Sequence, residues 1–242
     1  MWQFDIFKRE NLIQGISDTS FGPIKKGNSK NIQAFFSFLG YKISLGQIVW
    51  AEQVFGNKVH VCQKEDSGKI IKGVDGLISN VGGQILSILT GDCLPILLFD
   101  PQKEVVGILH GSRKSLLKGI IENGLLEMKS IFKSRVESIL VGIGPHIRRC
   151  HYYLGSEIFE ELKNTSFKKY FVFKDKKFYF DLTKLTIDKL LKAGIKKENI
   201  EDCQICTFCN FKEYYSRRKQ KENPTIYPLK NPNFGNFLGL KK

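Results

Sequence analysis

Residues 48–109 consist of short apolar segments separated by turn-forming residues, and this pattern constrains the fold more than any other feature of the sequence. The segments have the length of buried strands. The pairs Gly56-Asn57, Gly82-Gly83 and Gly91-Asp92 and one Asp-Pro turn separate several of them. We predict strands at residues 48–54, 58–62, 75–79, 85–90, 94–99 and 105–109, the first two joined around a turn at Gly56-Asn57.

The rest of the chain alternates between helical and strand-like patterns. Apolar residues three and four apart predict helices at residues 29–39, 115–132, 156–162 and 182–193. We also expect a strand followed by a loop within residues 11–27, strands at residues 138–143, 177–181 and 200–207, and an irregular tail from Asn223 onward. The alternation predicts an α/β fold in which mixed β-sheets are flanked by helices, as a single domain spanning residues 1–242.

Composition and terminal sequence indicate in which compartment the protein works and which partners it has. No run of about 18 apolar residues occurs, so we expect no membrane-spanning helix and no membrane partner. The residues after Met1 lack the pattern of a signal peptide, and we expect a cytoplasmic protein whose six cysteines are free thiols, metal ligands or catalytic groups. The net charge of +14 comes mostly from scattered lysines, which argues against a nucleic-acid partner.

The strongest candidate site combines a cysteine and a histidine at predicted strand ends. Cys93 follows the turn-forming pair Gly91-Asp92, and His110 ends a predicted strand directly before another glycine. Either residue alone is more typical of a buried structural position. If the two strands are neighbours in one sheet, Cys93 and His110 meet at its edge, where functional sites usually lie.

Several short motifs occur in the order typical of a known family. Residues 74–79 read Val-Asp-Gly-Leu-Ile-Ser, residues 90–95 read Thr-Gly-Asp-Cys-Leu-Pro, and residues 110–114 read His-Gly-Ser-Arg-Lys. Further matches are Gly-Pro-His-Ile at residues 144–147, with Tyr152 and Gly155, and Cys-Thr at residues 206–207, with Tyr-Tyr-Ser at residues 214–216. Over roughly residues 45–220 the chain resembles the YfiH-type laccase-domain family of purine-nucleoside enzymes.

The resemblance implies a metal site and a nucleoside substrate. In this family two histidines and one cysteine hold a metal, and Cys93 and His110 match two of these ligands. Zinc suits such a ligand set, with copper as the alternative. The implied reactions are phosphorolysis of adenosine, inosine or methylthioadenosine and deamination of adenosine, with a purine nucleoside and phosphate as the small-molecule partners.

One departure from the family pattern affects the metal site. Phe55 stands where the resemblance places the third ligand histidine, and phenylalanine cannot bind a metal. His60 is the candidate replacement, because the turn after Phe55 breaks the alternation of a single strand. A chain with only Cys93, His110 and the neighbouring Asp92 is expected to bind metal weakly, as a weakened enzyme or a degenerate family member.

Other residues are assigned to supporting roles. Arg113, Lys114 and Arg148 are candidate phosphate-binding residues, since a phosphorolytic enzyme must hold an anion near the sugar, although a solvated basic surface explains them equally well. Asp92 is a candidate catalytic residue beside Cys93. Asp75 either orients a ligand or caps a turn.

Three other interpretations remain open. Cys203, Cys206 and Cys209 have the spacing of a metal knuckle or an iron–sulfur motif, but no fourth ligand follows them, and Cys62 and Cys150 are expected in the core. The aromatic and basic residues 214–221 are compatible with a catalytically impaired binding module that contacts nucleic acid or protein. Cys93 and His110 are also compatible with a cysteine hydrolase in which Cys93 is the nucleophile.

Overall fold

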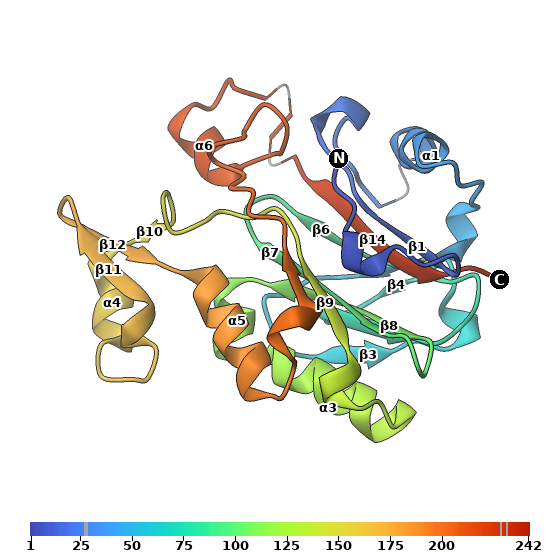
Figure 1. Cartoon of the computed structure of the whole chain (residues 1–242). Coiled ribbons are helices and arrows are strands. Elements are labelled where there is room, and N and C mark those ends of the chain that lie inside the picture. Colours follow the sequence, from blue (N-terminus) through green and yellow to red (C-terminus); the bar gives the residue numbers. More distant parts are fainter. Residues whose placement is uncertain (27–28, 228, 231) are drawn as a thin grey trace.

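Two larger mixed β-sheets pack face to face in the computed structural model, which describes residues 1–26, 29–227, 229–230 and 232–242 (Figure 1). The first sheet has the strand order β1 (Leu12–Ile16), β14 (Phe234–Leu240), β6 (Ile85–Thr90), β2 (Ile48–Ala51) and β4 (Ile70–Ile71). The second has the order β13 (Ile200–Asp202), β9 (Leu140–Ile143), β7 (Leu94–Asp100), β8 (Val105–Gly111), β5 (Gly76–Ser79) and β3 (Val59–Val61).

Helices cover the outer face of each sheet. Ile32, Phe35 and Phe36 of α1 (Ser29–Phe38) pack against Trp50 and Phe237 of the first sheet. The outer face of the second sheet is covered by α2 (Arg113–Leu117), α3 (Ile120–Phe132) and α5 (Leu182–Lys192). The predicted α/β fold with mixed sheets flanked by helices is therefore confirmed.

Strand β7 shows why the central segments are continuously apolar. Leu97 and Phe99 point into the core between the two sheets, whereas Ile96 and Leu98 point toward the helices. Because the strand is buried on both faces, neither set of alternate side chains can be polar. The apolar run at residues 94–99 is thus a central strand, as predicted.

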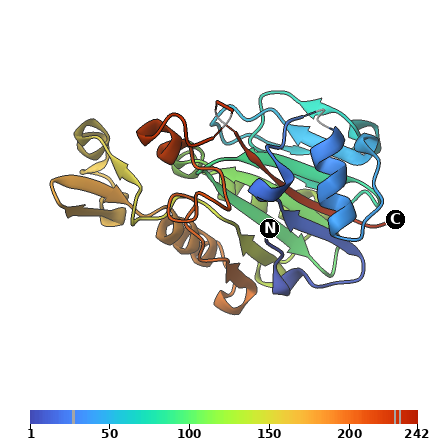
Figure 2. The same cartoon turned by 90° about the horizontal axis from the view of Figure 1, so that it is seen from above.

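A smaller unit projects from the body formed by the two large sheets. It contains a three-stranded sheet in the order β10 (Tyr153–Leu154), β12 (Lys177–Phe180) and β11 (Phe171–Lys174). Helix α4 (Ser156–Leu162) packs against it through the stacked rings of Phe159 and Phe178. Figures 1 and 2 both show this unit extending away from the body.

Residues 48–62 do not form the hairpin that the turn at Gly56-Asn57 predicted. Strand β2 pairs with β6 and β4 of the first sheet, and β3 pairs with β5 of the second. The connecting residues therefore cross from one sheet to the other. Their backbone N–H groups bond to the carboxylate of Asp75, which directly precedes β5, instead of closing a turn.

Strand β14 contradicts the predicted irregular tail. It lies inside the first sheet, between β1 and β6, although the tail contains several prolines. Pro228 and Asn231 of the tail lie outside the described residues, as does Gly27 in the expected loop. Glycine is required in this strand at Gly239, where an added Cβ would lie 2.5 Å from the carbonyl oxygen of Gln84. A glycine-rich strand lacks the usual β signal, which explains the wrong prediction.

The predicted helix over residues 115–132 is broken into α2 and α3. Gly119 between them has a φ of 90°, in the left-handed region that glycine tolerates. Several other predicted strands are shorter in the structure; residues 200–207 form a strand only over Ile200–Asp202. The helix α6 (Arg217–Glu222) was not predicted. No helix in the described part of the chain is long and apolar enough to cross a membrane.

Candidate active site

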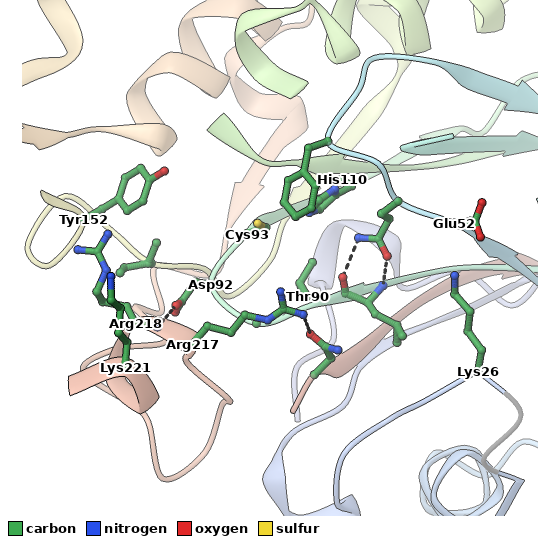
Figure 3. Close-up of a pocket in the computed structure, with 16 residues that line it drawn as sticks. Lys26, Glu52, Thr90, Asp92, Cys93, His110, Tyr152, Arg217, Arg218 and Lys221 are labelled. Carbon is green, nitrogen blue, oxygen red and sulfur yellow. Dashed lines mark hydrogen bonds between the residues drawn. The ribbon is translucent and has the colours of Figure 1, made fainter. Parts of the chain in front are cut away.

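Cys93 and His110 lie at one edge of the second sheet because β7 and β8 are antiparallel neighbours. Leu94 pairs with Gly111 and Pro95 with His110, so the start of β7 lies beside the end of β8. The close approach requires Gly111, where a Cβ would lie 2.6 Å from the carbonyl oxygen of Leu94. The structure thus brings together the two residues on which the sequence-based site depends (Figure 3).

The imidazole of His110 is held between an acid and a thiol. Its Nδ1–H donates to Oδ1 of Asp75 at 2.7 Å, which leaves Nε2 available to the Cys93 thiol. Burial by itself lowers the pKa of His110, but the Cys93 sulfur and the Asp75 carboxylate outweigh it and raise the pKa to about 9. The carboxylate and the sulfur thus favour the protonated form of His110, although its side chain is almost completely buried.

Asp75 also organises the loop that faces His110. Its carboxylate is fully buried and accepts the backbone N–H groups of Val54 (3.1 Å), Phe55 (3.0 Å) and Gly56 (2.7 Å). Burial by itself raises the pKa of Asp75, but the hydrogen bonds from His110 and Gly56 outweigh it and lower the pKa. One ionised carboxylate thus connects the loop, β5 and His110.

Phe55 adopts a strained backbone conformation at this loop. Its φ is 60°, which is rare for an aromatic residue and is held in place by the three bonds to Asp75. The Phe55 ring packs edge-on against His110, with ring centroids 5.3 Å apart. The phenylalanine therefore lies next to His110, in the region where the family resemblance places a third metal ligand.

The donor atoms at this site do not complete the zinc site that the resemblance implies. A catalytic zinc is held by three protein ligands and keeps one open position. In the described residues, no group of three His, Cys, Asp or Glu side chains close enough to share an ion includes Cys93 or His110. With Phe55 in the third position, the site offers two ligands, which is too few for zinc or for copper.

A cavity of about 550 Å³ opens in front of Cys93 and His110 (Figure 3). Its wall combines apolar side chains with four cationic ones. The lining residues are Lys26, Glu52, Gln53, Phe55, Leu89, Thr90, Gly91, Asp92, Cys93, His110, Ile147, Tyr152, Arg217, Arg218, Lys221 and Asn233. This volume is within the range of small-molecule sites.

Asp92 lines the cavity, but its carboxylate is used to connect two loops. Oδ1 accepts the Thr207 hydroxyl at 2.7 Å, and Oδ2 accepts the backbone N–H of Arg218 at 2.6 Å. The backbone carbonyl of Asp92 accepts the N–H of Ile147 at 2.9 Å. Burial raises the pKa of Asp92. These contacts indicate a positioning role, and direct catalysis by Asp92 stays a prediction.

Tyr152 and Arg218 also line the cavity. The Arg218 guanidinium donates to the carbonyl of Tyr153 at 3.0 Å and lies over the Tyr153 ring, 4.4 Å from its centroid. Burial raises the pKa of Tyr152 to about 12, against the effects of Arg113 and Arg218, so its hydroxyl is protonated at neutral pH. Arg113 does not line the cavity itself; its charge acts on the Tyr152 hydroxyl.

The remaining predicted site residues lie outside the cavity lining. Lys114 is an exposed residue of α2. His60 bonds to Asp66 through Nε2 at 2.9 Å, and Cys62 is the third member of this small cluster. The suggestion that His60 replaces the missing ligand therefore has no support in the geometry, because its ring is paired away from Cys93.

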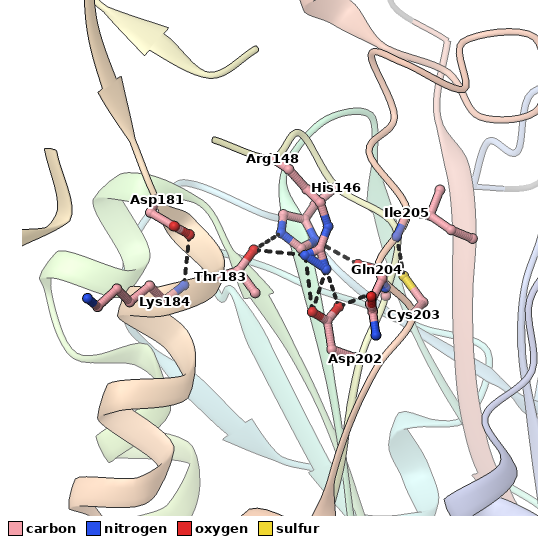
Figure 4. A network of polar contacts seen from close by, with 10 residues as sticks. His146, Arg148, Asp181, Thr183, Lys184, Asp202, Cys203, Gln204 and Ile205 are labelled. Atoms are coloured by element: carbon pink, nitrogen blue, oxygen red, sulfur yellow. Dashed lines mark hydrogen bonds and ion pairs between the residues drawn. The ribbon is translucent and has the colours of Figure 1, made fainter. Parts of the chain in front are cut away.

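Arg148 belongs to a separate buried network (Figure 4). It forms a bidentate ion pair with Asp202 and also donates to Thr183 at 3.3 Å. His146 donates from Nδ1 to the Gly144 carbonyl and accepts the Thr183 hydroxyl at Nε2, both at 2.8 Å. Full burial, together with the charge of Arg148, lowers the pKa of His146 to about 4.

The sequence reasoning missed the cationic residues of the cavity. Arg217, Arg218 and Lys221 come from α6, and Lys26 comes from the loop before α1. The first three lie in the basic run at residues 214–221, which suggested nucleic-acid binding instead. The signal was present, but only the packing of α6 against Asp92 shows that the run faces the Cys93 cavity.

The fold and the grouping of Cys93, His110 and Asp75 define a two-sheet α/β protein with a small-molecule cavity at its sheet edge. The chain belongs to the YfiH-type family described as multi-copper polyphenol oxidoreductase laccase, whose sequence pattern matches residues 20–225. The resemblance seen in the sequence motifs is thus confirmed.

Named relatives agree with this assignment. The chain is similar to a purine nucleoside phosphorylase of Clostridium acetobutylicum, 32% identical over 152 residues that cover 62% of this chain and 61% of that protein. It is also similar to an adenosine deaminase from an unknown prokaryotic organism, 25% identical over 73% of this chain and 71% of that protein. The match therefore spans less than two thirds of the clostridial relative's length.

A solved structure shows the same fold. The crystal structure of YlmD from Geobacillus stearothermophilus superposes with a TM-score of 0.84 at 21% identity, covering 99% of this chain and 94% of that one.

Replacing Asp75 with alanine is expected to destabilise the protein strongly. Asp75→Ala leaves three N–H groups and the His110 ring without their acceptor, and we expect a loss of about 3–5 kcal/mol in the free energy of unfolding. Urea denaturation followed by circular dichroism measures it. Asp5→Ala is the control, since Asp5 is exposed and forms a surface ion pair with Lys8, and should change stability by less than about 0.5 kcal/mol. Equal losses in the two variants would contradict the role given to Asp75.

The buried His146 is expected to make stability depend on pH. Its pKa is about 4 in the folded state, whereas the unfolded side chain titrates near 6.5. As pH falls from 6.5 toward 4 the unfolded chain binds a proton that the folded chain does not, so the free energy of unfolding decreases. His146→Gln should flatten this slope by up to about 1.4 kcal/mol per pH unit, measured by urea unfolding at several pH values. Parallel pH profiles for the two proteins would rule the effect out.

Proposed function

We propose that the chain binds a purine nucleoside and phosphate in the Cys93 cavity and cleaves the nucleoside by phosphorolysis. The observation that carries this proposal is the position of Lys26, Arg217, Arg218 and Lys221 around Cys93 and His110. Two acids line the same cavity, Glu52 and Asp92, and both oxygens of Asp92 already accept hydrogen bonds. The cavity therefore favours an anion such as phosphate.

The shape and chemistry of the wall suit a nucleoside beside that anion. Phe55, Leu89, Ile147 and Tyr152 supply an apolar surface against which a purine ring can pack. The relatives named as a purine nucleoside phosphorylase and an adenosine deaminase support a purine nucleoside as the substrate.

The chain's own residues can supply the proton that phosphorolysis needs. The C1′–N9 bond of the nucleoside breaks, a bond from C1′ to a phosphate oxygen forms, and the departing purine takes up a proton. His110, kept protonated by Cys93 and Asp75, is the proposed donor of this proton from Nε2, and the phosphate monoanion restores it. The cationic residues would hold the phosphate and stabilise the charge that develops as the bond breaks.

No step is assigned to a metal at this cavity, because Phe55 leaves the donor set incomplete. Deamination requires an activated water, for which the family's zinc is the usual source. Phosphorolysis is therefore better supported than deamination by the residues present.

One observation favours a second candidate function. Cys93, His110 and Asp75 follow one another as thiol, imidazole and carboxylate, which is the order of groups in cysteine hydrolases. In that reaction Cys93 would attack an acyl carbon and His110 would carry the proton.

A nucleoside assay separates the two candidates. Inosine or adenosine is incubated with and without phosphate, and the released base is measured by chromatography. We expect release only with phosphate, a decrease of at least about 100-fold in kcat for His110→Ala, and a raised KM for phosphate in Lys221→Gln. Lys192→Gln, an exposed change on α5, should leave both constants unchanged.

The alternatives predict different results in the same preparation. The cysteine hydrolase would be supported, and phosphorolysis rejected, if the protein released no base but hydrolysed esters. That ester hydrolysis should resist chelators and be lost on alkylation of Cys93. Absence of both activities, with salt-dependent retention on single-stranded RNA, would favour the binding module.

Restoring the family ligand provides a direct test of the metal argument. Phe55→His adds an imidazole next to His110 at a positive φ that histidine tolerates better than phenylalanine. We expect about one more zinc per chain than in the unchanged protein, measured by mass spectrometry of the metal content. Phe55→Leu is the control and should add none. Equal zinc in both variants would show that Phe55 does not limit metal binding.

A further inference from the structure

Four potential metal ligands from two distant parts of the sequence meet on the side of the molecule behind Tyr152. Cys150 and His151 come from the loop between β9 and β10, and Cys206 and Cys209 come from the loop after β13. Their ligand atoms, three sulfurs and one ring nitrogen, all lie within 4.8 Å of one another. This cluster shares no residue with the lining of the Cys93 cavity.

The separations match those around a single tetrahedral ion. The Sγ atoms of Cys150 and Cys206 are 3.5 Å apart, those of Cys150 and Cys209 are 3.8 Å apart, and Cys209 Sγ lies 3.3 Å from Nδ1 of His151. A Zn–S distance of about 2.3 Å and a Zn–N distance of about 2.0 Å, at tetrahedral angles, place two sulfurs about 3.8 Å apart and sulfur and nitrogen about 3.5 Å apart.

Ordinary core packing does not account for this convergence. Cys150 and Cys209 are exposed, so burial of apolar thiols cannot explain why they point at each other; the prediction that Cys150 is a core residue is wrong. Cys203, the first cysteine of the Cys-x-x-Cys-x-x-Cys motif, is buried in the core between the sheets and does not join the cluster. The motif therefore divides into one core residue and two potential ligands.

We propose that Cys150, His151, Cys206 and Cys209 form a structural zinc site. Three thiolates and one imidazole are a typical closed ligand set for structural zinc, without an open position for substrate. Ligand atoms this close together leave room for one ion and not for an iron–sulfur cluster. The His151 ring is already oriented by stacking on Phe208, with centroids 4.1 Å apart and an interplanar angle of 16°.

The ion would join the two loops that form one wall of the cavity. Tyr152 follows His151 directly and lines the cavity. Thr207 follows Cys206 directly and donates to Asp92, which also holds the N–H of Arg218. The Arg218 guanidinium reaches back to the carbonyl of His151 at 3.4 Å. Zinc would thus stabilise this wall from a position outside the cavity, without touching the reacting groups. This role does not depend on which reaction the cavity performs.

Metal analysis of a small set of variants tests the site. The full chain carrying Cys93→Ala, which removes any contribution from the cavity, is purified under mild reduction and its zinc is measured. We expect about one zinc per chain. Adding Cys209→Ser should remove it, whereas adding Cys203→Ala, a change within the same motif but outside the cluster, should keep it. Adding His151→Ala should lose the zinc, and His151→Cys should retain it.

A second readout covers variants that fold poorly without metal. Replacement of zinc by Co²⁺ in the Cys93→Ala protein should give the absorption band of a cobalt–thiolate centre, and removal of the ion with a chelator should lower Tm. Cys203→Ala should behave in the same way. The proposal would be overturned if the Cys93→Ala protein contained no zinc, or if the Cys209→Ser and Cys203→Ala variants contained equal zinc. A Cys150–Cys206 disulfide, seen as a mass lower by about 2 Da without reductant, would overturn it as well.

Discussion

The buried carboxylate of Asp75 is the interaction on which the arrangement of the site depends. It accepts three consecutive backbone N–H groups from the loop that crosses between the sheets, and it also accepts the Nδ1–H of His110. An ionised carboxylate is stable without solvent only when such donors surround it. The same four bonds set the strained conformation of Phe55, the orientation of the His110 ring and the path of the chain between the two sheets.

The packing of the two sheets determines which residues share the cavity. Cys93 and His110 come from the second sheet, while Leu89 and Thr90 come from β6 of the first. Helix α6 adds three of the four cationic residues, Arg217, Arg218 and Lys221, and its first turn is held by the bond from the backbone N–H of Arg218 to Asp92. The site is therefore a property of the interface between the sheets. The cluster of Cys150, His151, Cys206 and Cys209 adjoins it through Tyr152, which follows His151 and lines the cavity.

Much of the fold and half of the central site could be predicted from the sequence, because these features rest on local patterns. The apolar run of β7, the helical spacing of α5 and the turn residues around Cys93 each report burial or backbone conformation over a few residues. Strands β7 and β8 are consecutive in the sequence and joined by a short turn. Their pairing, and with it the meeting of Cys93 and His110, could therefore be expected from the sequence. Motif order then indicated the family, which the match over residues 20–225 confirms.

Only the tertiary structure decided the features that join distant segments. The sequence cannot show that residues 54–56 bond to Asp75 instead of forming a hairpin, that the glycine-rich β14 lies inside a sheet between β1 and β6, or that Arg148 pairs with Asp202 away from the cavity. Nor does it show that Cys150 and His151 supply the partners that Cys206 and Cys209 lack nearby. By itself the sequence determined which segments are buried and which residue types are available for chemistry. The packing of the whole chain determined which of those residues meet, because contacts between separate segments of the sequence depend on how all the layers fit together.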